Sequence, residues 1–510
     1  MINRTTKNNP VTRRDFMKTT AITGAGVLLA GNPFTSAVIG LNKKKRYAHV
    51  GLGSRAHMYQ RAVNEGYKDY CEMVGLCDVN EGRMKLYQEL AKETTGKEIP
   101  IFHADDFDDM IRKTQPDVVI VTTVDGFHHQ YVIRGMELGC DVITEKPMTI
   151  DAEKCQKIID TQTKTGKRCT VTFNYRYSPP RSQVKDILMS DEIGEVLSVD
   201  FHWLLNTFHG ADYFRRWHSQ KKFSGGLMVH KATHHFDLVN WWLSSIPVSV
   251  MAMGKREFYI PEMAKRLGLD SHHERCHTCP EKEKCGFELS LEKSQNLKRL
   301  YLDNEKYDGY FRDRCVFRPD IDIEDTMNVI VQYDDHVQMS YSLNAFNSWE
   351  GYQINFNGTK GRLEHQVQES IYISGTDTVQ GGLQHGGTYT RVIPLRGPAR
   401  EYEPWSGEGG HGGGDRVLLD DIFLPEKKQD KYLRAADQRS GAYSILTGVA
   451  ANVSFNTHKE VKIADLVSGI GYPDYPEKSS RTAALPMPKK REPRQWQRRE
   501  RRDRSTNKTG

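Results

Sequence analysis

The sequence lacks a long hydrophobic run. The apolar stretch at residues 21–30 is about ten residues long and contains two glycines, whereas a membrane-spanning helix needs about 20 apolar residues. We therefore expect no stable insertion into a membrane. Hydrophobic residues make up 37% of the 510 residues and the mean hydropathy is −0.65, which is typical of a large soluble enzyme with two core-bearing domains.

The body of the chain also lacks an excess of positive charge. The net charge of +6 is concentrated at the ends, because residues 1–40 contribute +4 and residues 489–510 contribute +7, which leaves −5 for the remainder. A mildly acidic body argues against nucleic acid as a partner. The C-terminal end is rich in Arg and Pro without apolar periodicity, so residues 481–510 are predicted to form a disordered, solvated basic tail.

An export motif is present near the N-terminus. Thr12-Arg13-Arg14-Asp15-Phe16-Met17-Lys18, followed by the short apolar run, is typical of a twin-arginine signal, and residues 35–37 offer a small-residue cleavage site. The alternative is an arginine pair that opens an ordinary amphipathic helix. We expect residues 1–40 to be a signal peptide that engages the twin-arginine export machinery. This route carries folded proteins, so a periplasmic protein with its ligand loaded before export is predicted.

A glycine turn follows the first strand-like run, residues 47–50. In the sequence after it, Gly51 allows a tight bend, Gly53 lets the backbone approach a pyrophosphate, and Ser54 and Arg55 open a helix. A chance Gly-x-Gly turn is the alternative. The next apolar run ends 27 residues after Gly51, at Asp78.

The carboxylate of Asp78 suits a nicotinamide dinucleotide. An acid at the end of the second strand accepts hydrogen bonds from a ribose 2′-hydroxyl and repels a 2′-phosphate. The pattern therefore predicts NAD rather than NADP, although Arg83 nearby leaves NADP open.

Strand-like and helical runs alternate after this turn. Residues 117–123 and 141–144 are continuous apolar runs of the kind that a parallel sheet buries on both faces, with a helical run at 130–138 between them. The order predicts a doubly wound parallel sheet, a Rossmann domain over residues 41–170. Ligands bind at the carboxyl ends of such strands, which adds four candidate cofactor contacts: Thr123, His128, Glu145 and Lys146.

A family resemblance rests on Glu145-Lys146-Pro147 after a strand and on residues 123–128 (TVDGFH). Over residues 46–460 the chain resembles the glucose-fructose oxidoreductase, inositol dehydrogenase and MocA (Gfo/Idh/MocA) family. The resemblance implies that an α+β domain with a large open, mainly antiparallel sheet follows the Rossmann domain, here at residues 171–480. It also implies that Lys146 contacts the reacting hydroxyl. Val124 departs from the proline common in the family, a change expected to alter turn rigidity rather than chemistry.

A histidine-rich segment is predicted to open a helix in the second domain, starting near Gly225. On such a helix His230, His234 and Asp237 lie within about 60° of one another. The segment resembles the family motif Asp-x-Gly-x-His-x-x-Asp, with His234 and Asp237 matching and His230 in place of an acid. The resemblance implies that His234 is the acid–base group, titrating near a pKa of about 6.5, and that it matters more than His230.

Two alternatives stay open for these histidines. Side chains spaced by four residues on a helix can chelate a metal ion, and they can also belong to a hydrogen-bonded core network.

Other candidate substrate contacts lie before and after this segment. Arg176 lies in residues 173–179 (FNYRYSP), where aromatic and polar groups suit a sugar, although a strand turning into a proline-broken loop explains the segment too. His411 and Asp415 lie in HGGGDR, which resembles a family loop closing over the cleft; a flexible glycine hinge is the alternative.

Alternating runs predict antiparallel strands in the second domain. Residues 327–333 and 337–343 alternate around a turn at 334–335, and residues 352–357 continue the sheet. The other face of such a sheet commonly pairs with a second subunit, so we expect a homodimer or homotetramer.

Four cysteines gather in an insert at residues 256–320: Cys276, Cys279, Cys285 and Cys315. The first three are close enough in sequence to be ligands, so structural zinc, an iron-sulfur cluster and two disulfides in an oxidising periplasm are all open. We expect a structural staple rather than a redox catalyst. The other five cysteines are predicted to be buried thiols.

These patterns predict an exported NAD-dependent oxidoreductase of carbohydrate metabolism that acts on a secondary hydroxyl of a sugar or sugar derivative. Because the periplasm is not expected to hold a free nicotinamide pool, the cofactor should stay bound and be recycled. The first alternative is a redox-neutral glycoside hydrolase or lyase that works through a transient keto-sugar. The second is a non-catalytic sugar-binding protein with a vestigial Rossmann domain.

Overall fold

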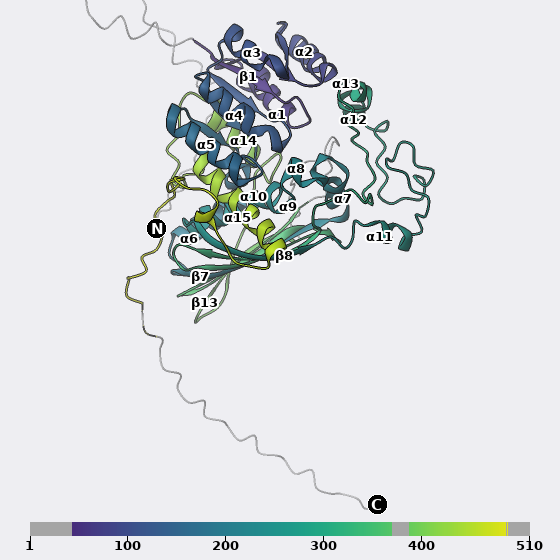
Figure 1. The fold of residues 1–510 in the computed structure, drawn as a ribbon. Helices are drawn as coiled ribbons and strands as arrows, with labels where there is room; N and C mark the ends of the chain where they lie inside the picture. Colours follow the sequence, from purple (N-terminus) through teal and green to yellow (C-terminus); the bar gives the residue numbers. More distant parts are fainter. Residues whose placement is uncertain (1–42, 370–386, 486, 488–510) are drawn as a thin grey trace, which may run out of the picture. The chain divides into compact units, whose positions relative to one another are not determined.

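The computed structural model describes residues 43–369, 387–485 and 487. The export motif, the predicted signal peptide and the tail beyond residue 487 lie outside the described residues, so these predictions are not addressed by the fold. From Lys44 on, the chain belongs to one compact unit. Its described part contains a six-stranded sheet followed by a nine-stranded sheet (Figure 1).

The first domain is a doubly wound parallel sheet, as predicted. Its strands follow the order β3-β2-β1-β4-β5-β6, and every neighbouring pair is parallel. The strands are β1 (Lys45–Val50), β2 (Cys71–Asp78), β3 (Ile101–His103), β4 (Val118–Val121), β5 (Asp141–Thr144) and β6 (Cys169–Val171). The helices are α1 (Ala56–Arg61), α2 (Glu81–Thr95), α3 (Phe107–Thr114), α4 (His128–Glu137) and α5 (Ala152–Thr165).

Local sequence signals set the bounds of these helices. The side chain of Asn80 accepts a hydrogen bond from the amide of Arg83 at the start of α2, and Asp151 does the same for Lys154 at the start of α5. Both helices end at a glycine with positive φ, Gly96 at 72° and Gly166 at 64°. Strand β4 is buried along its whole length, which explains its continuous apolar run.

The second domain is built on a mixed, mostly antiparallel sheet in the order β14-β13-β12-β11-β7-β10-β9-β8-β15. Among the described strands of this sheet, only β7 and β10 pair in parallel. The predicted strands at 327–333, 337–343 and 352–357 are confirmed as parts of β9, β10 and β11. The strands are β7 (Val196–Asn206), β8 (Pro247–Lys255), β9 (Thr326–Tyr333), β10 (Gln338–Asn347), β11 (Glu350–Gly358), β12 (Gly361–Glu369), β13 (Tyr389–Pro394), β14 (Arg400–Tyr402) and β15 (Val461–Lys462).

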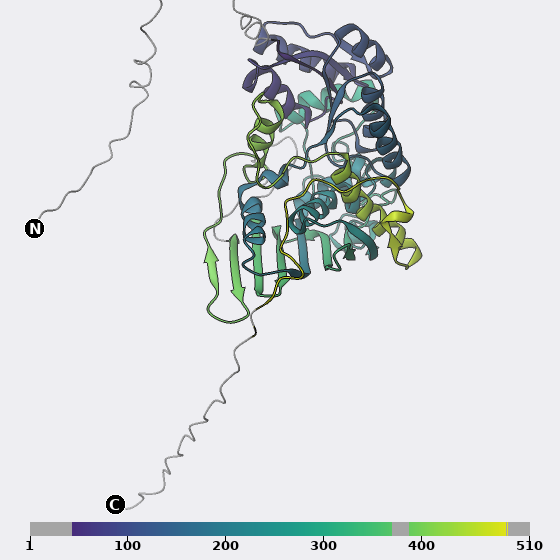
Figure 2. The same cartoon turned by 90° about the vertical axis from the view of Figure 1, so that its left-hand side faces the viewer.

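A layer of helices lies between this sheet and the first domain (Figures 1 and 2). Long helix α15 packs on β8 and against α9 and α10. A Cβ atom at Gly448 of α15 would lie 2.2 Å from the carbonyl oxygen of Met228, so the glycine permits the close approach that positions α9. The helices of the second domain outside the insert are α6 (Pro179–Met189), α7 (Thr207–Arg215), α8 (Lys221–Ser224), α9 (Leu227–His230), α10 (Ala232–Leu243), α14 (Gly414–Phe423) and α15 (Gln438–Thr457).

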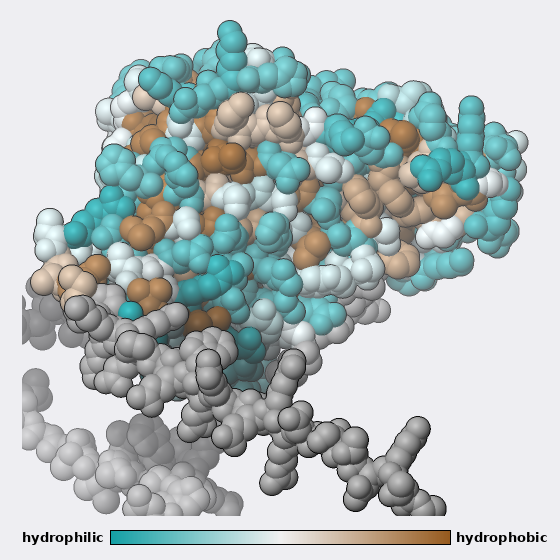
Figure 3. Space-filling model, turned by 90° about the horizontal axis from the view of Figure 1, so that it is seen from below, coloured by the Kyte–Doolittle hydropathy of each residue, from teal (hydrophilic) through white to brown (hydrophobic). Residues whose placement is uncertain are grey.

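The other face of the large sheet is exposed and partly apolar. Met251 of β8 and Ile330 of β9 are cross-strand partners that are 46% and 57% exposed, and Met253 is 67% exposed. Apolar residues lie among hydrophilic ones on the side seen from below in Figure 3. A second subunit on this face stays a prediction.

The insert between β8 and β9 carries α11 (Pro261–Arg266), α12 (Gln295–Leu300) and α13 (Glu305–Asp308). Its base is joined by an antiparallel bridge between Arg275 and Arg314. Cys276 and Cys315 follow the two bridge residues directly, and all four clustered cysteines line one small cavity together with Phe287 and Phe317. All nine cysteines are free thiols, and the five outside the insert are buried, as predicted.

No metal site accompanies these thiols. Within the described ranges, no three His, Cys, Asp or Glu side chains are placed to hold a metal ion. Among the described residues, the structure therefore shows neither a site for zinc or an iron-sulfur cluster nor a histidine chelate, and the two disulfides are absent because all four clustered cysteines are free. A search of the same residues finds no helix with the length and apolar character to cross a membrane.

The staple prediction can be tested with Cys279→Ser. Placing a hydroxyl in the partly buried cluster should cost about 1–3 kcal/mol and lower the melting temperature by a few degrees, while activity per folded molecule is largely kept. Calorimetry, thiol counting and metal analysis check this. Complete loss of activity in a fully folded variant would contradict a structural role.

Candidate active site

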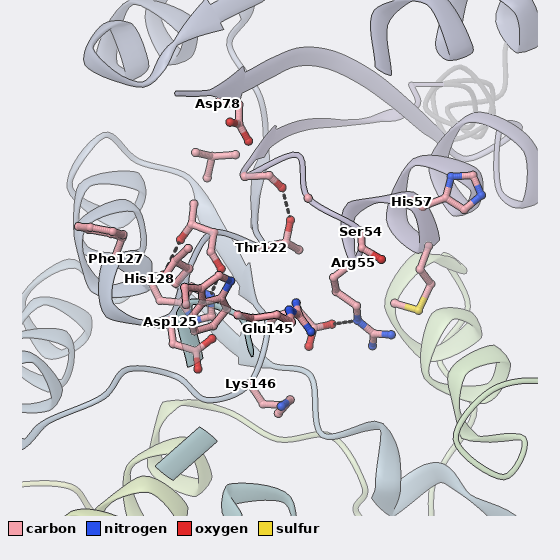
Figure 4. A pocket seen from close by; sticks show the side chains of 18 of the residues that line it. Ser54, Arg55, His57, Asp78, Thr122, Asp125, Phe127, His128, Glu145 and Lys146 are labelled. Carbon is pink, nitrogen blue, oxygen red and sulfur yellow. Dashed lines mark hydrogen bonds and ion pairs between the residues drawn. The ribbon is translucent and has the colours of Figure 1, made fainter. Parts of the chain in front are cut away.

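A single cavity of about 1580 Å³ combines residues from both domains. It lies at the carboxyl ends of β1, β4 and β5. In Figure 4, Asp78 lies toward one end and Lys146 toward the other, with Thr122 and Glu145 between them. The volume exceeds the roughly 300–1,000 Å³ of a pocket for one small ligand. There is room for an extended dinucleotide and a second molecule beside it.

The glycine turn fits a dinucleotide pyrophosphate. Gly51 has a φ of 87°, and a Cβ atom there would lie 2.4 Å from the amide nitrogen of Thr123, so a side chain is excluded. At Gly53 the nearest atom to an added Cβ would be the Tyr301 hydroxyl, 3.9 Å away. The turn is therefore packed closely on the Thr123 side of Gly51 and open beside Gly53. Its backbone is accessible to a phosphate on the open side.

Asp78 lies at the end of β2, where a ribose is expected. Its carboxylate accepts hydrogen bonds from the amides of Leu52 (2.5 Å) and Asn80 (2.8 Å) and from the guanidinium of Arg83 (3.1 Å). These donors hold the carboxylate at the cavity wall. Arg83 in turn pairs with Asp308 of the insert at 2.6 Å.

Glu145 follows β5 and connects the end of that strand to the residues after the glycine turn. Its carboxylate accepts hydrogen bonds from Arg55 (Figure 4) and from the Tyr59 hydroxyl, both at 2.7 Å. Burial alone would raise the pKa of Glu145, but the positive charge of Arg55 outweighs it and the pKa is lowered. Glu145 is therefore ionised, and it fixes the strand end that carries Lys146.

Lys146 lines the cavity, with its ammonium at 3.1 Å from the carbonyl oxygen of His230. Burial lowers the pKa of Lys146 to about 8, although Asp125 and Glu145 act in the opposite direction. A lysine with a pKa near the working pH can exchange protons, whereas an ordinary surface lysine stays charged.

His230 is held by a carboxylate from the other domain. Its Nδ1 lies 2.5 Å from Oδ2 of Asp125, and both side chains are buried. Burial and the positive charges of Lys146 and Arg216 lower the pKa of His230 well below its usual value, so the ring is neutral. Asp125 thus supplies a carboxylate beside position 230, where the sequence resemblance implied an acid.

His234 lines the same cavity and stacks on Tyr175, with ring centroids 4.1 Å apart. Burial and the charges of Lys146 and Lys231 lower the pKa of His234 well below 6.5. The expected titration near 6.5 is therefore wrong, because the cavity disfavours a second positive charge. Its Nδ1 has no hydrogen-bond partner among the described residues.

The expected single helix over this segment is interrupted. Helix α9 ends at His230 and α10 begins at Ala232, and the two histidines on either side of the break both face the cavity. Asp237 does not line the cavity.

Arg176 and Asp237 pair with each other instead of lining the cavity. The guanidinium donates two hydrogen bonds to the carboxylate, at 2.8 and 2.5 Å, and the side chains are 0% and 1% exposed. Burial raises the pKa of Asp237 to about 6, against the opposing charge of Arg176. The structure does not bring either residue to a ligand, because a buried guanidinium needs a carboxylate of its own.

His411 and Asp415 act as a unit. Nδ1 of His411 lies 2.8 Å from Asp415, which also accepts a hydrogen bond from Asn174 and lies 3.8 Å from Arg55. His411 lines the cavity, whereas Asp415 lies behind it at the start of α14. The loop is thereby connected to the glycine turn.

The remaining cofactor candidates all line the cavity, namely Gly51, Gly53, Ser54, Arg55, Asp78, Thr123, His128 and Glu145. Sequence reasoning missed other lining residues: Asp125, Tyr175, Arg216, His218, Lys231, Tyr301, Asp308 and Tyr310. Asp125, Tyr175 and Lys231 lie inside the motifs described above and could have been found there. The last three belong to the insert, whose sequence carries no recognisable dinucleotide motif.

Comparison with known proteins supports an oxidoreductase. The model of the NAD-binding Rossmann fold of the Gfo/Idh/MocA oxidoreductase family matches residues 45–173, and the model of its C-terminal alpha/beta domain matches residues 185–463. The protein YteT of Bacillus subtilis is 36% identical over 420 residues, which cover 79% of this chain and 94% of that protein.

Shorter similarities link the chain to proteins with named activities. A glycosyl hydrolase family 109 protein of Akkermansia muciniphila is 32% identical over 30% of this chain and 32% of its own length. D-glucoside 3-dehydrogenase of Escherichia coli is 29% identical over 30% of this chain and 41% of its own length. The aldose-aldose oxidoreductase of Caulobacter crescentus shares the fold, with a TM-score of 0.54 at 16% identity over 82% of this chain and all of that one.

Lys146→Ala should lower turnover by about 10²- to 10⁴-fold, the usual cost of losing a positioned proton-transfer group. Dinucleotide binding should be nearly unchanged. In the wild type the rate of oxidation should rise as the pH rises through about 8, because only neutral Lys146 can accept a proton.

A pH series of both proteins tests this, with Lys157→Ala as the control, since Lys157 is exposed on α5 and pairs with Glu153. Equal turnover in the Lys146 variant would remove this residue from the chemistry.

Proposed function

The chain belongs to the Gfo/Idh/MocA family of oxidoreductases, and from this we propose that it oxidises a secondary hydroxyl of a sugar or sugar derivative with a tightly held NAD. The observation that carries the proposal is the shared cavity. A glycine turn and Asp78 lie on one wall, and Lys146 meets His230, His234 and His411 from the second domain at the other.

In this proposal, the substrate hydroxyl that reacts lies beside the side chain of Lys146. The glycine turn and Asp78 would hold the dinucleotide, which when bound would supply the two-electron chemistry as a hydride acceptor for the carbinol carbon. Lys146 takes the hydroxyl proton, which its lowered pKa allows. Neutral His234 holds the hydroxyl by a hydrogen bond, and the Asp125–His230 pair fixes the backbone carbonyl that positions the ammonium.

NAD is favoured over NADP by the charges near Asp78. Arg83, the residue that could bind a 2′-phosphate, is already paired with Asp78 and Asp308. The sugar class is supported by the similarity to D-glucoside 3-dehydrogenase.

We also propose that the protein is exported folded to the periplasm with its cofactor in place. The twin-arginine motif supports this, because that route carries folded proteins. A bound dinucleotide must then be reoxidised where it lies, by a second sugar or by the product itself. The exposed apolar face of β8 and β9 supports a homodimer or homotetramer.

A redox-neutral reaction is the second candidate, favoured by the similarity to the glycosyl hydrolase family 109 protein. Oxidation of a hydroxyl carbon makes the neighbouring C–H acidic, which permits loss of the glycosidic oxygen. Return of the hydride to the carbonyl carbon then leaves no net oxidation. His218 and His411 also line the cavity, where neutral rings can donate or accept hydrogen bonds.

Protein recovered from the periplasm should contain close to one NAD per chain. Heat denaturation followed by mass spectrometry of the supernatant measures this, and a sugar panel read at 340 nm identifies reducing substrates. A protein that contains no NAD or NADP and binds neither with micromolar affinity would refute the proposal. Release of an aglycone with no change at 340 nm would favour the redox-neutral reaction.

His234→Ala should cost more than His230→Ala. Because the Nδ1 of His230 is already paired with Asp125, its loss should appear mainly in KM, whereas loss of His234 removes a group that faces the reacting hydroxyl. Steady-state kinetics with the best sugar of the panel compare the two. The opposite ranking would assign the principal role to the Asp125–His230 pair.

A further inference from the structure

The insert between β8 and β9 reaches across to the first domain. Tyr301, Asp308, Gly309 and Tyr310 line the cavity beside the glycine turn and Asp78. Figure 1 shows α12 and α13 beside α2, and the contacts agree. Residues about 250 positions apart in sequence thus share the wall at the end of the cavity far from Lys146.

Tyr301 lies over the glycine turn. Its hydroxyl accepts a hydrogen bond from the amide of Ser54 at 3.2 Å and lies above Gly53. The ring is only 6% exposed, because it packs with Leu291 and Leu297 in a small apolar core of the insert. The hydroxyl is therefore held rigidly at the place where a pyrophosphate meets the turn.

The insert also docks closely on the start of α2. The amide of the Asn80 side chain donates to the carbonyl oxygen of Asn304 at 2.9 Å. A Cβ atom at Gly82 would overlap the Asn304 side chain, so the glycine permits this approach. Leu300 packs against the apolar cores of both the insert and the first domain.

The insert is braced internally at its base. Arg275 pairs with Glu305 and with Asp313, both at 2.7 Å, next to the cysteine cluster. The Arg275–Glu305 pair therefore connects the segment that carries Tyr301 and Asp308 to the base of the insert.

Asp308 completes a charge arrangement around Arg83. The guanidinium lies 3.1 Å from Asp78 and 2.6 Å from Asp308, and Arg83 is 8% exposed. One cation between two carboxylates leaves a net charge of −1 where a 2′-phosphate, with about −1.5 to −2 charges, would have to bind. Without Asp308, Arg83 would have only Asp78 to neutralise it and could turn to a phosphate.

We propose that this insert is a cofactor clamp, in which Tyr301 retains the dinucleotide over the glycine turn and Asp308 sets the preference for NAD over NADP. The clamp rests on the proposed function, since it presumes a dinucleotide at the turn. It supplies a physical reason for a cofactor that stays bound through export and turnover: dissociation requires a segment of the second domain to move away.

Two substitutions test the clamp in the full-length holoenzyme. Asp308→Asn should raise the affinity for NADP relative to NAD by about tenfold or more, the scale of a lost charge-assisted pair, and Asp308→Glu should keep the wild-type ratio. Tyr301→Phe should speed release of bound NADH several-fold. Release is followed by NADH fluorescence after dilution into excess NAD, and the affinities by calorimetry with NAD and NADP.

Matched controls lie in the same segment. Asp303→Asn removes an exposed carboxylate that pairs with Lys298, and Tyr307→Phe removes the hydroxyl of a tyrosine that is 37% exposed. Neither residue lines the cavity, so both variants should behave as the wild type. Melting temperatures confirm that all variants are folded.

The outcomes separate the clamp from the proposed function. If the wild type binds NAD but the Asp308 and Tyr301 variants match their controls in release rate and in NADP preference, the clamp is overturned and the oxidoreductase stands. If the wild type binds neither dinucleotide, the proposed function fails and the clamp with it. Faster release of NADH from Tyr301→Phe and a shift toward NADP in Asp308→Asn, with both controls unchanged, support the clamp.

Discussion

The ion pair between Arg55 and Glu145 is the interaction on which the rest of the site depends. It connects the helix after the glycine turn to the end of β5, so the place for a cofactor and the place of Lys146 are held in one frame. Arg55 also approaches Asp415, which orients His411 from the second domain. One partly exposed cation thus joins three segments that are far apart in the chain, and Glu145 stays ionised because of it.

Burial of the basic side chains around the cavity sets their protonation states. The cavity contains several basic side chains, and each positive charge makes the next one less favourable. The pKa of Lys146 falls to about 8, and those of His230 and His234 fall well below 6.5. The histidines therefore act as neutral hydrogen-bonding groups, while Lys146 is the group that titrates near the working pH. Neutral Lys146 can therefore accept a proton from a substrate, and no histidine of the cavity has to become charged.

The insert extends this organisation to the other end of the cavity. Its cysteine-lined base, the Arg275 pairs and its small apolar core support the two residues that face the first domain, Tyr301 and Asp308. The insert thus gives the second domain a contact with the cofactor end as well as the substrate end. Such an arrangement suits an enzyme that keeps its dinucleotide and recycles it.

Sequence patterns determined the Rossmann order, the glycine turn with Asp78, the antiparallel strands and the position of Lys146. Each of these depends on local periodicity or on a backbone conformation that few residues allow, such as the positive φ of Gly51. The tertiary structure alone decided that Arg176 and Asp237 pair with each other, that Asp125 holds His230, and that an insert without a dinucleotide motif covers the turn. These contacts join residues 61 to 247 positions apart, and a buried charge takes whichever partner the fold brings near, which no local pattern records.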